Sequence, residues 1–324
     1  MELAEKIING ERAAIAKAIT LVESSKQVDR IESRKLISQL IDNPGKSIRV
    51  GFSGPPGVGK STFIESFGSY LVGKEFKLGI LAIDPSSQIT GGSILGDKTR
   101  MIEISKNPNT FIRSTPSRGS LGGISNGTRE ASIILDAAGY DYIFIETVGV
   151  GQSEVVASNL VDIFSLIVGP GSGDELQGIK KGITEYADIF IVNKNDGNLK
   201  IEASKTAADY KSAISYYKKN EDSSSKEVLL VSAIEQTGMD EVINTIQGIV
   251  LQNKKNNSFE SKRSEQLKFW LSEEVKNIMQ LDIQRKIDKA GSIGHFSDRI
   301  INGDISMYDA IETITDKLRN EKSY

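Results

Sequence analysis

The residues best suited to chemistry in this chain lie in the stretch GFSGPPGVGKSTF, which begins at Gly51. It carries Gly54, Gly59, Lys60 and Ser61 in the spacing G-x-x-x-x-G-K-S. Glycines let backbone N–H groups turn inward around anionic oxygens, and a lysine adds a full positive charge to the same concavity. A serine hydroxyl at this position can bind Mg²⁺. The stretch therefore predicts a site for the phosphates of a nucleotide.

The neighbouring elements are those that a phosphate site requires. The apolar run IRVGFS comes before the loop, and a helical pattern, KSTFIESFGSYLVG, follows it. The helix would direct the positive end of its dipole at the phosphates. The predicted phosphate-binding residues are Gly54, Pro55, Pro56, Gly57, Val58, Gly59, Lys60, Ser61 and Thr62.

A second motif, NKND at 193–196, indicates which base the site accepts. The carboxylate of Asp196 can accept hydrogen bonds from the N1–H and the exocyclic amine of guanine, a donor pair that adenine lacks. A polar site discriminates strongly against a base that cannot pair with it. We therefore expect GTP or GDP as the ligand and not ATP. The predicted base-binding residues are Asn193, Lys194 and Asp196, with Ser232, Ala233 and Ile234 supplying a backbone N–H for the guanine carbonyl.

Three acids that follow apolar runs or lie in glycine-rich loops could serve a metal ion: Asp84, Asp97 and Glu146. Mg²⁺ bound to a nucleotide keeps several waters and takes one or two carboxylates directly. We expect Asp84 and Asp97 beside Ser61 at the metal, and Glu146 to reach it through water. The predicted catalytic set is Lys60, Asp97, Glu146 and Gly149, the last donating its N–H to the γ-phosphate. The residue that orients water and any arginine that completes the site stay open; the candidates are Gln152, Glu154, Arg113, Arg118 and Arg129.

Short apolar runs alternate with helical patterns through the middle of the chain. The six runs are SIRVGFSG, LGILAID, YDYIFIET, DIFSLIVG, ADIFIVNK and EVLLVSA. Continuous apolar strands that alternate with helices are typical of an α/β, doubly wound, mostly parallel sheet, here of the P-loop NTPase class. The predicted domains are a helical segment at 1–45, broken at Gly10 and near Ser24, a GTPase domain at 46–252 and a helical region at 253–324. The stretches STPSRGSLGGIS and GPGSGDELQGIKKGI are predicted to be irregular functional loops.

Composition excludes several functions. The chain has 324 residues, a net charge of −3, no cysteine and one histidine, His295. A thiolate zinc site, an iron–sulfur cluster and a cysteine nucleophile are thus excluded, and nucleic-acid binding is not favoured. No run approaches the roughly 20 apolar residues of a membrane helix, and the first residues do not resemble a secretory signal. We expect a cytoplasmic protein that binds neither nucleic acid nor membrane.

Taken together, these motifs resemble the MeaB/ArgK-type GTPases, whose mitochondrial relatives serve methylmalonyl-CoA mutase. The resemblance depends on GPPGVGKST, LAIDPSS, GGSILGDKTRM, FIRSTPSRGSLGG, ETVGVGQSE, GPGSGDELQGIKKGI and NKNDG. It implies a homodimeric GTPase that gates cofactor loading into an adenosylcobalamin-dependent acyl-CoA mutase and protects or reactivates that mutase. It also implies a C-terminal dimerisation arm and a third switch loop in which Asp174, Gln177 and Lys180 couple to the partner.

Other functions remain possible at this point. The chain has no D-x-H-x-x-G stretch, so we expect no cobalamin ligation through His295, and the chain is not itself the mutase. The alternatives are a kinase linked to amino-acid transport, a metal-insertion GTPase, and a GTP-gated scaffold that hardly hydrolyses. A metal-insertion role fits poorly with one histidine and no cysteine. The sequence does not choose among methylmalonyl-CoA, isobutyryl-CoA, ethylmalonyl-CoA and hydroxyisobutyryl-CoA mutases as the partner.

Overall fold

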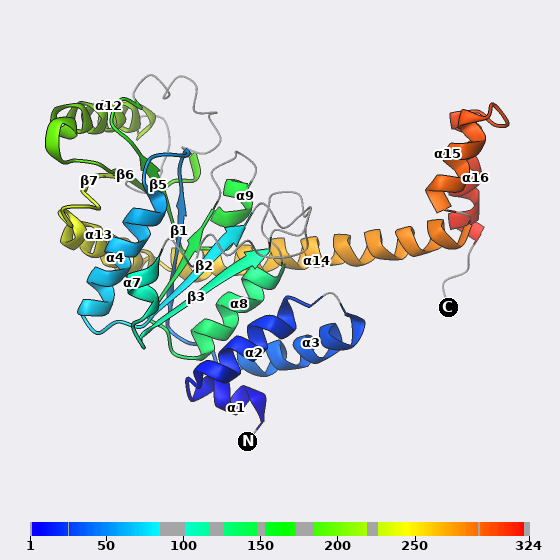
Figure 1. The fold of residues 1–324 in the computed structure, drawn as a ribbon, viewed down its shortest axis with the longest axis horizontal. Coiled ribbons are helices and arrows are strands. Elements are labelled where there is room, and N and C mark those ends of the chain that lie inside the picture. Colours follow the sequence, from blue (N-terminus) through cyan, green and yellow to red (C-terminus); the bar gives the residue numbers. More distant parts are fainter. Residues whose placement is uncertain are drawn as a thin grey trace. The chain divides into compact units, whose positions relative to one another are not determined.

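The computed structural model describes residues 2–24, 26–84, 101–116, 126–147, 153–172, 185–218, 226–290 and 292–320. Packing divides the chain into two compact units, residues 1–263 and residues 264–324, and each is described by itself. The first unit contains a seven-stranded sheet and the helices that cover it (Figure 1). Within the described residues, no helix is both long enough and apolar enough to cross a membrane.

The sheet is parallel in every recorded pairing, and its strand order is β3-β2-β4-β1-β5-β6-β7. The strands are β1 Ile48–Ser53, β2 Leu78–Asp84, β3 Thr110–Pro116, β4 Tyr142–Glu146, β5 Ile163–Val168, β6 Ile189–Val192 and β7 Glu227–Leu230. Strands β2, β3 and β4 lie on one side of β1, with β4 inserted between β1 and β2, and strands β5, β6 and β7 follow outward on the other side. In such open sheets, ligands bind at the carboxyl ends of the strands near the point where the order reverses, which here is β1.

The predicted fold class is confirmed, with one strand more than the sequence indicated. All residues of β5 and β6 are buried, as expected for strands that helices cover on both faces. The unpredicted strand is β3, TFIRSTP, whose last three residues the sequence analysis placed in a loop. Among the described strands it pairs with β2 alone and forms one edge of the sheet, where a proline such as Pro116 is tolerated.

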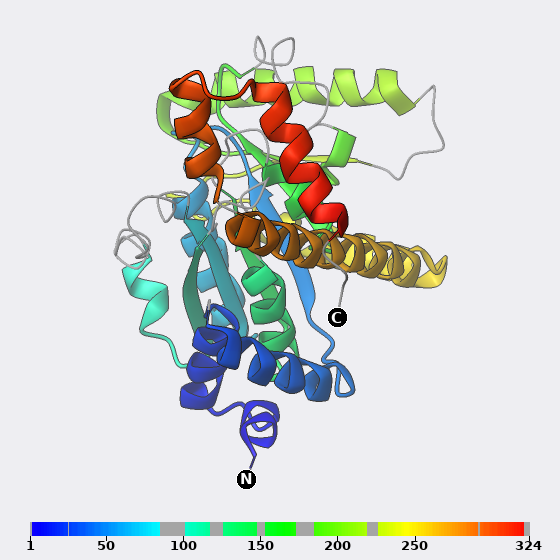
Figure 2. The same cartoon turned by 90° about the vertical axis from the view of Figure 1, so that its right-hand side faces the viewer.

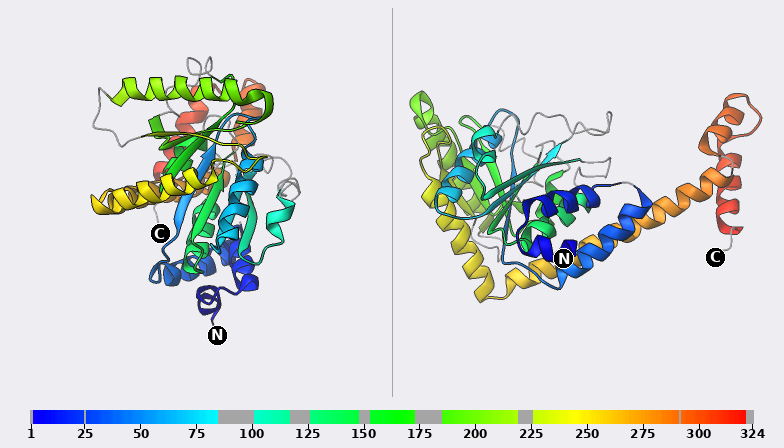
Figure 3. Two further views of the ribbon diagram at one scale, coloured as in Figure 1. Left: turned by 90° about the vertical axis from the view of Figure 1, so that its left-hand side faces the viewer. Right: turned by 60° about the horizontal axis from the view of Figure 1, so that its bottom comes forward.

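Helices cover both faces of this sheet. Those of the first unit are α1 Leu3–Ile8, α2 Arg12–Val22, α3 Gln27–Ile41, α4 Lys60–Gly73, α7 Ile102–Ser105, α8 Asn126–Ala137, α9 Ser153–Ser158, α12 Lys200–Lys218 and α13 Met239–Lys255. A 3-10 turn, η1 Gly197–Leu199, precedes α12, and α14 Ser258–Ala290 begins in this unit. Helices α4, α7 and α13 share a buried core on one face of the sheet. In the left view of Figure 3, α12 lies above and α13 below β6 and β7, on opposite faces.

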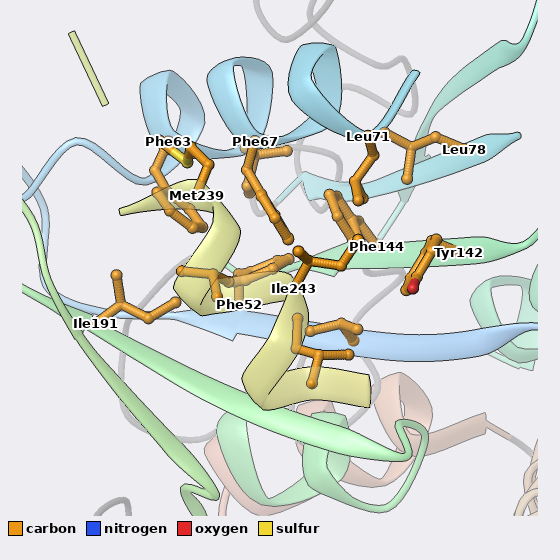
Figure 4. Close-up of a cluster of buried hydrophobic side chains, with 14 of the residues drawn as sticks. Phe52, Phe63, Phe67, Leu71, Leu78, Tyr142, Phe144, Ile191, Met239 and Ile243 are labelled. Carbon is orange, nitrogen blue, oxygen red and sulfur yellow. The ribbon is translucent and has the colours of Figure 1, made fainter. Parts of the chain in front are cut away.

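Aromatic side chains form the core under α4. Figure 4 shows Phe63 and Phe67 of α4 directed toward Phe52 of β1 and Phe144 of β4, with Ile243 of α13 beside them. The rings of Phe52 and Phe144 pack edge to face with their centroids 4.9 Å apart, and Phe67 stacks on Phe144 with a centroid distance of 5.6 Å. Burying each ring contributes about 1.5–3 kcal/mol. This packing holds the first turns of α4 firmly against the carboxyl end of β1.

The N-terminal helices α1, α2 and α3 pack together and cover the outer side of α8, which itself packs on β2, β3 and β4 (Figure 2). Arg12 of α2 lies over the ring of Phe111 and donates a hydrogen bond to the carbonyl of Thr110, both in β3. Arg113 of β3 pairs with Glu23, the residue that caps the carboxyl end of α2. The helical segment predicted at 1–45, with breaks near Gly10 and Ser24, thus holds the edge of the sheet.

The second unit consists of the rest of α14 together with α15 Ser292–Ile301 and α16 Met307–Asn320. Helices α15 and α16 pack against each other, and Phe296 and Ala310 are buried. Many of the large apolar side chains of this unit are nevertheless exposed. Along α14 they include Leu267, Leu271, Val275 and Ile278.

A buried ionic cluster fixes the start of α14 to the first unit. The carboxylate of Asp162, only 3% exposed, accepts hydrogen bonds from Arg49 at 2.8 Å and from Arg263 at 2.9 and 2.8 Å. Lys262 donates to the carbonyl of Asp162 at 2.8 Å. By packing, the first unit extends to Arg263 and so includes the first turns of α14. The domain boundary predicted at 252–253 stays a prediction.

Replacing Asp162 with asparagine is expected to destabilise the protein by about 3–5 kcal/mol at pH 7, because two guanidinium groups would face each other without a buried anion. Burial alone would raise the pKa of Asp162, but the charges and hydrogen bonds of Arg49 and Arg263 outweigh it and hold this pKa well below its ordinary value. The folded state therefore loses this stabilisation as the pH falls below about 4, where the unfolded carboxyl binds its proton first. Chemical denaturation at pH 7 and pH 3 measures both effects.

The matched control is Asp282→Asn, which removes the same charge from the exposed surface of α14. It should leave the denaturation midpoint nearly unchanged. The difference in the free energy of unfolding between the unmodified protein and Asp162→Asn should be smaller at pH 3 than at pH 7. If this difference is the same at both pH values, Asp162 is not the titrating anion of the cluster.

Candidate functional site

The glycine-rich loop has the backbone geometry that a phosphate cradle needs. It runs from the end of β1 at Ser53 to the start of α4 at Lys60. Gly54, Gly57 and Gly59 have φ values of 150°, 83° and 88°, which residues with a Cβ rarely adopt. Gly59 is the residue that caps the amino end of α4. The loop therefore presents a helix amino terminus at the carboxyl edge of the sheet.

Two of these glycines are also required by their neighbours. A Cβ on Gly54 would lie 2.1 Å from the carbonyl oxygen of Ile167 in β5, and one on Gly59 would lie 2.8 Å from the side-chain nitrogen of Asn193. Within the part of the chain that the structure describes, nothing lies within 4 Å of the corresponding position at Gly57. Substitution at Gly54 or Gly59 would thus push the loop away from β5 or from Asn193, while Gly57 is required only for its backbone angle.

The charged group of the motif bonds to the loop itself, and its hydroxyl bonds to the neighbouring strand β4. Lys60 Nζ donates hydrogen bonds to the carbonyls of Gly54 at 2.7 Å and Pro55 at 3.4 Å. Ser61 Oγ donates to Glu146 Oε1, at the end of β4, at 2.8 Å. The ammonium group therefore lies where the loop closes, and a hydroxyl and a carboxylate lie together beside it. These are hard oxygen donors, which suit Mg²⁺.

Asn193, predicted as a base-binding residue, connects the phosphate loop to the base-recognition loops. Its amide nitrogen donates to the carbonyl of Val58 at 3.0 Å, and its carbonyl oxygen accepts the N–H of Ala233 at 3.1 Å. Its side chain is buried, with 2% of the residue exposed. One buried side chain thus joins segments after β1, β6 and β7, which brings the three nucleotide motifs into one site.

The rest of the NKND motif also makes contacts across the site. Lys194, which has a positive φ of 61°, donates from Nζ to the carbonyl of Gly57 at 2.6 Å. Ser232 donates its hydroxyl to the carboxylate of Asp196 and accepts the N–H of Glu235 at 3.0 Å. These contacts fix the orientation of the Asp196 carboxylate, the group that would distinguish guanine from adenine.

Three backbone N–H groups were predicted to contact the guanine carbonyl, and two of them already donate hydrogen bonds within the chain. The N–H of Ala233 donates to Asn193, and that of Ser232 donates to the carbonyl of Thr237 at 3.2 Å. The third residue, Ile234, is 77% exposed. The loop is therefore held in place by intrachain bonds before any base is considered.

Several predicted residues lie outside the part of the chain that the structure describes. They are Asp97, Gly149, Asp174, Gln177 and Lys180, together with the side chain of Asp84, whose backbone ends β2. β2 and β4 are neighbours, so Asp84 and Glu146 end adjacent strands at the same edge of the sheet. Among the described residues, no group of three His, Cys, Asp or Glu side chains could hold a metal ion.

Two features of the site were not anticipated from the sequence. Arg113, one of the arginines considered for the phosphates, is engaged by Glu23 and Thr20 of α2. Thr206 of α12 accepts a hydrogen bond from the N–H of Gly171, just after β5, at 3.1 Å. No local pattern signals either contact, because each joins residues that are far apart in the chain.

A family model matches this chain over residues 15–288, and it is described as methylmalonyl-CoA mutase-associated GTPase MeaB. The matched range contains the phosphate loop, the NKND motif, and both irregular glycine-containing stretches. It also extends over the N-terminal helix α2 and most of α14. The match therefore covers helices and loops that other proteins with a phosphate loop need not have.

Individual relatives agree with the family model. The chain is 47% identical over 245 residues to a probable GTPase of Mycobacterium tuberculosis, covering 76% of this chain and 73% of that protein. It is 39% identical over 312 residues to the mitochondrial methylmalonic aciduria type A homologue of Caenorhabditis elegans, covering 93% and 77%. A crystal structure described as an LAO/AO transport system kinase matches with a TM-score of 0.73 and 28% identity, covering 98% and 97% of the two chains.

Proposed function

The chain belongs to the family of methylmalonyl-CoA mutase-associated GTPases, and from that membership we propose that it is a chaperone for an adenosylcobalamin-dependent acyl-CoA mutase. In this proposal GTP hydrolysis gates cofactor loading and protects or reactivates the mutase. The observation that carries the nucleotide part is the buried Asn193, which joins the phosphate loop to the base-recognition loops. The mutase part is supported by the family and by the relatives' names.

We assign the nucleotide contacts to the motifs described above. Residues 54–62 would surround the α-, β- and γ-phosphates, with Lys60 reaching the β- and γ-phosphates. Asp196 would accept both donors of the guanine edge, while Lys194 lies along the base and the backbone of 232–234 faces the guanine carbonyl. The contacts of Lys60 with Gly54 and Pro55 support this assignment, because they hold the ammonium group at the mouth of the cradle.

The donor set beside the phosphates fits Mg²⁺. Ser61 would be a direct ligand, Asp84 and Asp97 are the proposed carboxylates, and Glu146 would act through water. The hydrogen bond from Ser61 to Glu146 supports an indirect role for Glu146, because it places this carboxylate beside the hydroxyl that is the proposed direct ligand. When bound, Mg²⁺ would neutralise charge on the β- and γ-phosphate oxygens.

In the proposed reaction, water attacks the γ-phosphorus in line with the bond to the leaving GDP. Lys60 balances the negative charge that develops on the transferred group, and the N–H of Gly149 is proposed to donate to a γ-phosphate oxygen. The protein supplies position and charge, with no covalent intermediate. No arginine is assigned to the transition state. Arg113 is held by Glu23, Arg118 lies outside the described residues, and Arg129 stays a candidate.

We propose that the chain acts as a homodimer in the cytoplasm. The exposed apolar side chains of α14, Leu267, Leu271, Val275 and Ile278, recur at spacings of three and four residues along one side of the helix. A second copy of this chain is the proposed occupant of that side. Asp174, Gln177 and Lys180 are proposed as contacts that report nucleotide state to the mutase.

Single-turnover hydrolysis of GTP labelled in the γ-phosphate tests the proposed partnership. We expect slow release of inorganic phosphate from the protein alone and a rate roughly tenfold or more higher with a saturating cognate mutase, a coupling of ordinary size. The four mutase classes considered above form the panel of partners. An unchanged rate in a complex whose formation is shown independently would contradict the proposal.

The same experiment separates the kinase alternative, which the name of the matched crystal structure keeps in view. A kinase would place the label on a protein or small-molecule acceptor at a rate comparable with hydrolysis. The proposed GTPase would place it in inorganic phosphate throughout. Stoichiometric nickel or zinc binding by the purified protein would instead favour metal insertion.

A further inference from the structure

The short segment 169–172, which directly follows β5, lies between the phosphate loop and α12. On the first side, the carbonyl of Ile167 approaches Gly54 closely, and a Cβ on Gly169 would lie 3.7 Å from Val58 Cγ1. The carbonyl of Val168 accepts the N–H of Asn193 at 2.9 Å. The end of β5 is thus in contact with both the phosphate loop and the base-recognition motif.

On the other side, one buried hydroxyl fixes this segment to α12. The N–H of Gly171 donates to Thr206 Oγ1 at 3.1 Å, and Thr206 is 2% exposed. Gly171 has a φ of 80°, and a Cβ there would lie 3.0 Å from Glu202 Oε1, one turn before Thr206. The backbone of Gly171 is therefore held in a conformation that favours glycine, against two side chains of the same helix.

Helix α12 begins at the base-recognition motif. Asp196 precedes the turn η1, accepts the N–H of Leu199 at 3.0 Å, and leads directly into α12 at Lys200. Lys200 pairs at 3.5 Å with Glu235, whose N–H donates to Ser232 in the loop after β7. The first two turns of one helix thus connect the residues that would read the base with the residue that holds Gly171.

We propose that Thr206 is a positioning residue that links guanine-nucleotide occupancy to segment 169–172, and through it to partner coupling. The segment leads straight into the stretch that contains Asp174, Gln177 and Lys180. Occupancy would reach it from two sides, through the phosphate loop at Gly54 and Val58 and through α12 at Thr206. The hydroxyl of Thr206 holds the segment in a fixed position against α12. The inference rests on the proposed function for the identity of the partner.

The decisive variant is Thr206→Val, which keeps the shape of the side chain and removes the acceptor for the Gly171 N–H. Amide hydrogen exchange in the peptide covering 169–172 should accelerate by roughly tenfold, the equivalent of one hydrogen bond. The difference in exchange between the GDP-bound and GTP-bound protein should disappear there. The dissociation constants of GDP and GTP should stay within about threefold, because the base and phosphate contacts are intact. The mutase-dependent acceleration should fall by roughly fivefold or more.

Two controls isolate the acceptor. Thr206→Ser retains the hydroxyl and should retain the nucleotide-dependent exchange. Ser204→Ala removes a different hydroxyl from α12, one that donates to the carbonyl of Lys200 at 2.9 Å, and should behave like the unmodified protein. If Thr206→Val does not fold, Gly171→Ala decides the matter, because it disturbs the same contact from an exposed position and should give the same loss of nucleotide-dependent exchange.

Failure of the inference and failure of the proposed function give different results. If the unmodified protein shows no response to any mutase, the proposed partner is wrong, while the exchange measurements still test Thr206. If the unmodified protein responds and Thr206→Val keeps both the response and the nucleotide-dependent exchange, the inference is overturned and the proposed function stands.

Discussion

Replacing Lys60 with alanine is expected to abolish measurable GTP hydrolysis and to weaken GTP binding by roughly a thousandfold, or about 4 kcal/mol. The ammonium group is the one full positive charge inside the phosphate loop motif, and hydrogen bonds to charged groups contribute about 1.5–3 kcal/mol each. In the structure Lys60 also bonds the carbonyls of Gly54 and Pro55, so its removal leaves the mouth of the loop less fixed. Calorimetric titration with GTP and Mg²⁺ measures the loss of affinity.

Lys74→Ala is the matched control, because it removes the same charge immediately after the other end of α4. Lys74 is exposed and pairs with Asp240 at 3.3 Å. This variant should bind and hydrolyse GTP like the unmodified protein, and both variants should keep the helix content of the parent. If Lys60→Ala binds GTP as tightly as the unmodified protein does, the phosphate loop is not the GTP-binding site.

The strands that the sequence revealed are those whose burial leaves a continuous apolar run. β5 and β6 are buried along their whole length, and their sequences IFSLIV and IFIV carry almost no polar interruption. β3 is an edge strand with the sequence TFIRSTP, in which polar residues and a proline obscure the pattern. Its arginine pairs with Glu23 of the N-terminal segment, a partner that the local sequence cannot show. The other edge strand, β7, has the sequence EVLL and keeps an apolar run, so the sequence predicted it. β3 has no such run, and contacts with distant residues hold it in place.

The candidate site divides in the same way. Backbone-driven features were visible in the sequence, because glycine spacing and a following helix are local properties. The link from Asn193 to the phosphate loop could also be foreseen, since the motif and its strand position require it. The contact of Thr206 with Gly171 could not be foreseen, because nothing in the sequence near either residue indicates the other. Nor could the sequence show that Arg263 closes a buried cluster around Asp162, because the two residues are far apart in the chain.

Replacing Asp196 with asparagine is expected to change the base preference of the site from guanine to xanthine. The carboxylate offers two acceptors to the N1–H and the 2-amino group of guanine, whereas a carboxamide offers one acceptor and one donor. The 2-amino group would then face an NH₂ group, and GTP binding should weaken by roughly a hundredfold or more, given about 1.5–3 kcal/mol for each charge-assisted bond. Xanthine carries a carbonyl at that position, so xanthosine triphosphate should gain what GTP loses. Competition binding with guanosine, xanthosine, inosine and adenosine triphosphates measures the change.

Hydrolysis then shows whether the substitution acts at the base alone. Asp196→Asn should hydrolyse xanthosine triphosphate at nearly the rate at which the parent hydrolyses GTP, because Lys60, Ser61 and Glu146 are untouched and Ser232 can still donate to the asparagine oxygen. Asp209→Asn, the same chemical change on α12 outside the motif, should keep the preference for GTP. Equal binding of ATP and GTP by the parent, or an unaltered GTP affinity in Asp196→Asn, would mean that Asp196 does not read the base. Since Asn193 would still join the three loops in that case, the phosphate loop would have to accept triphosphates without regard to the base.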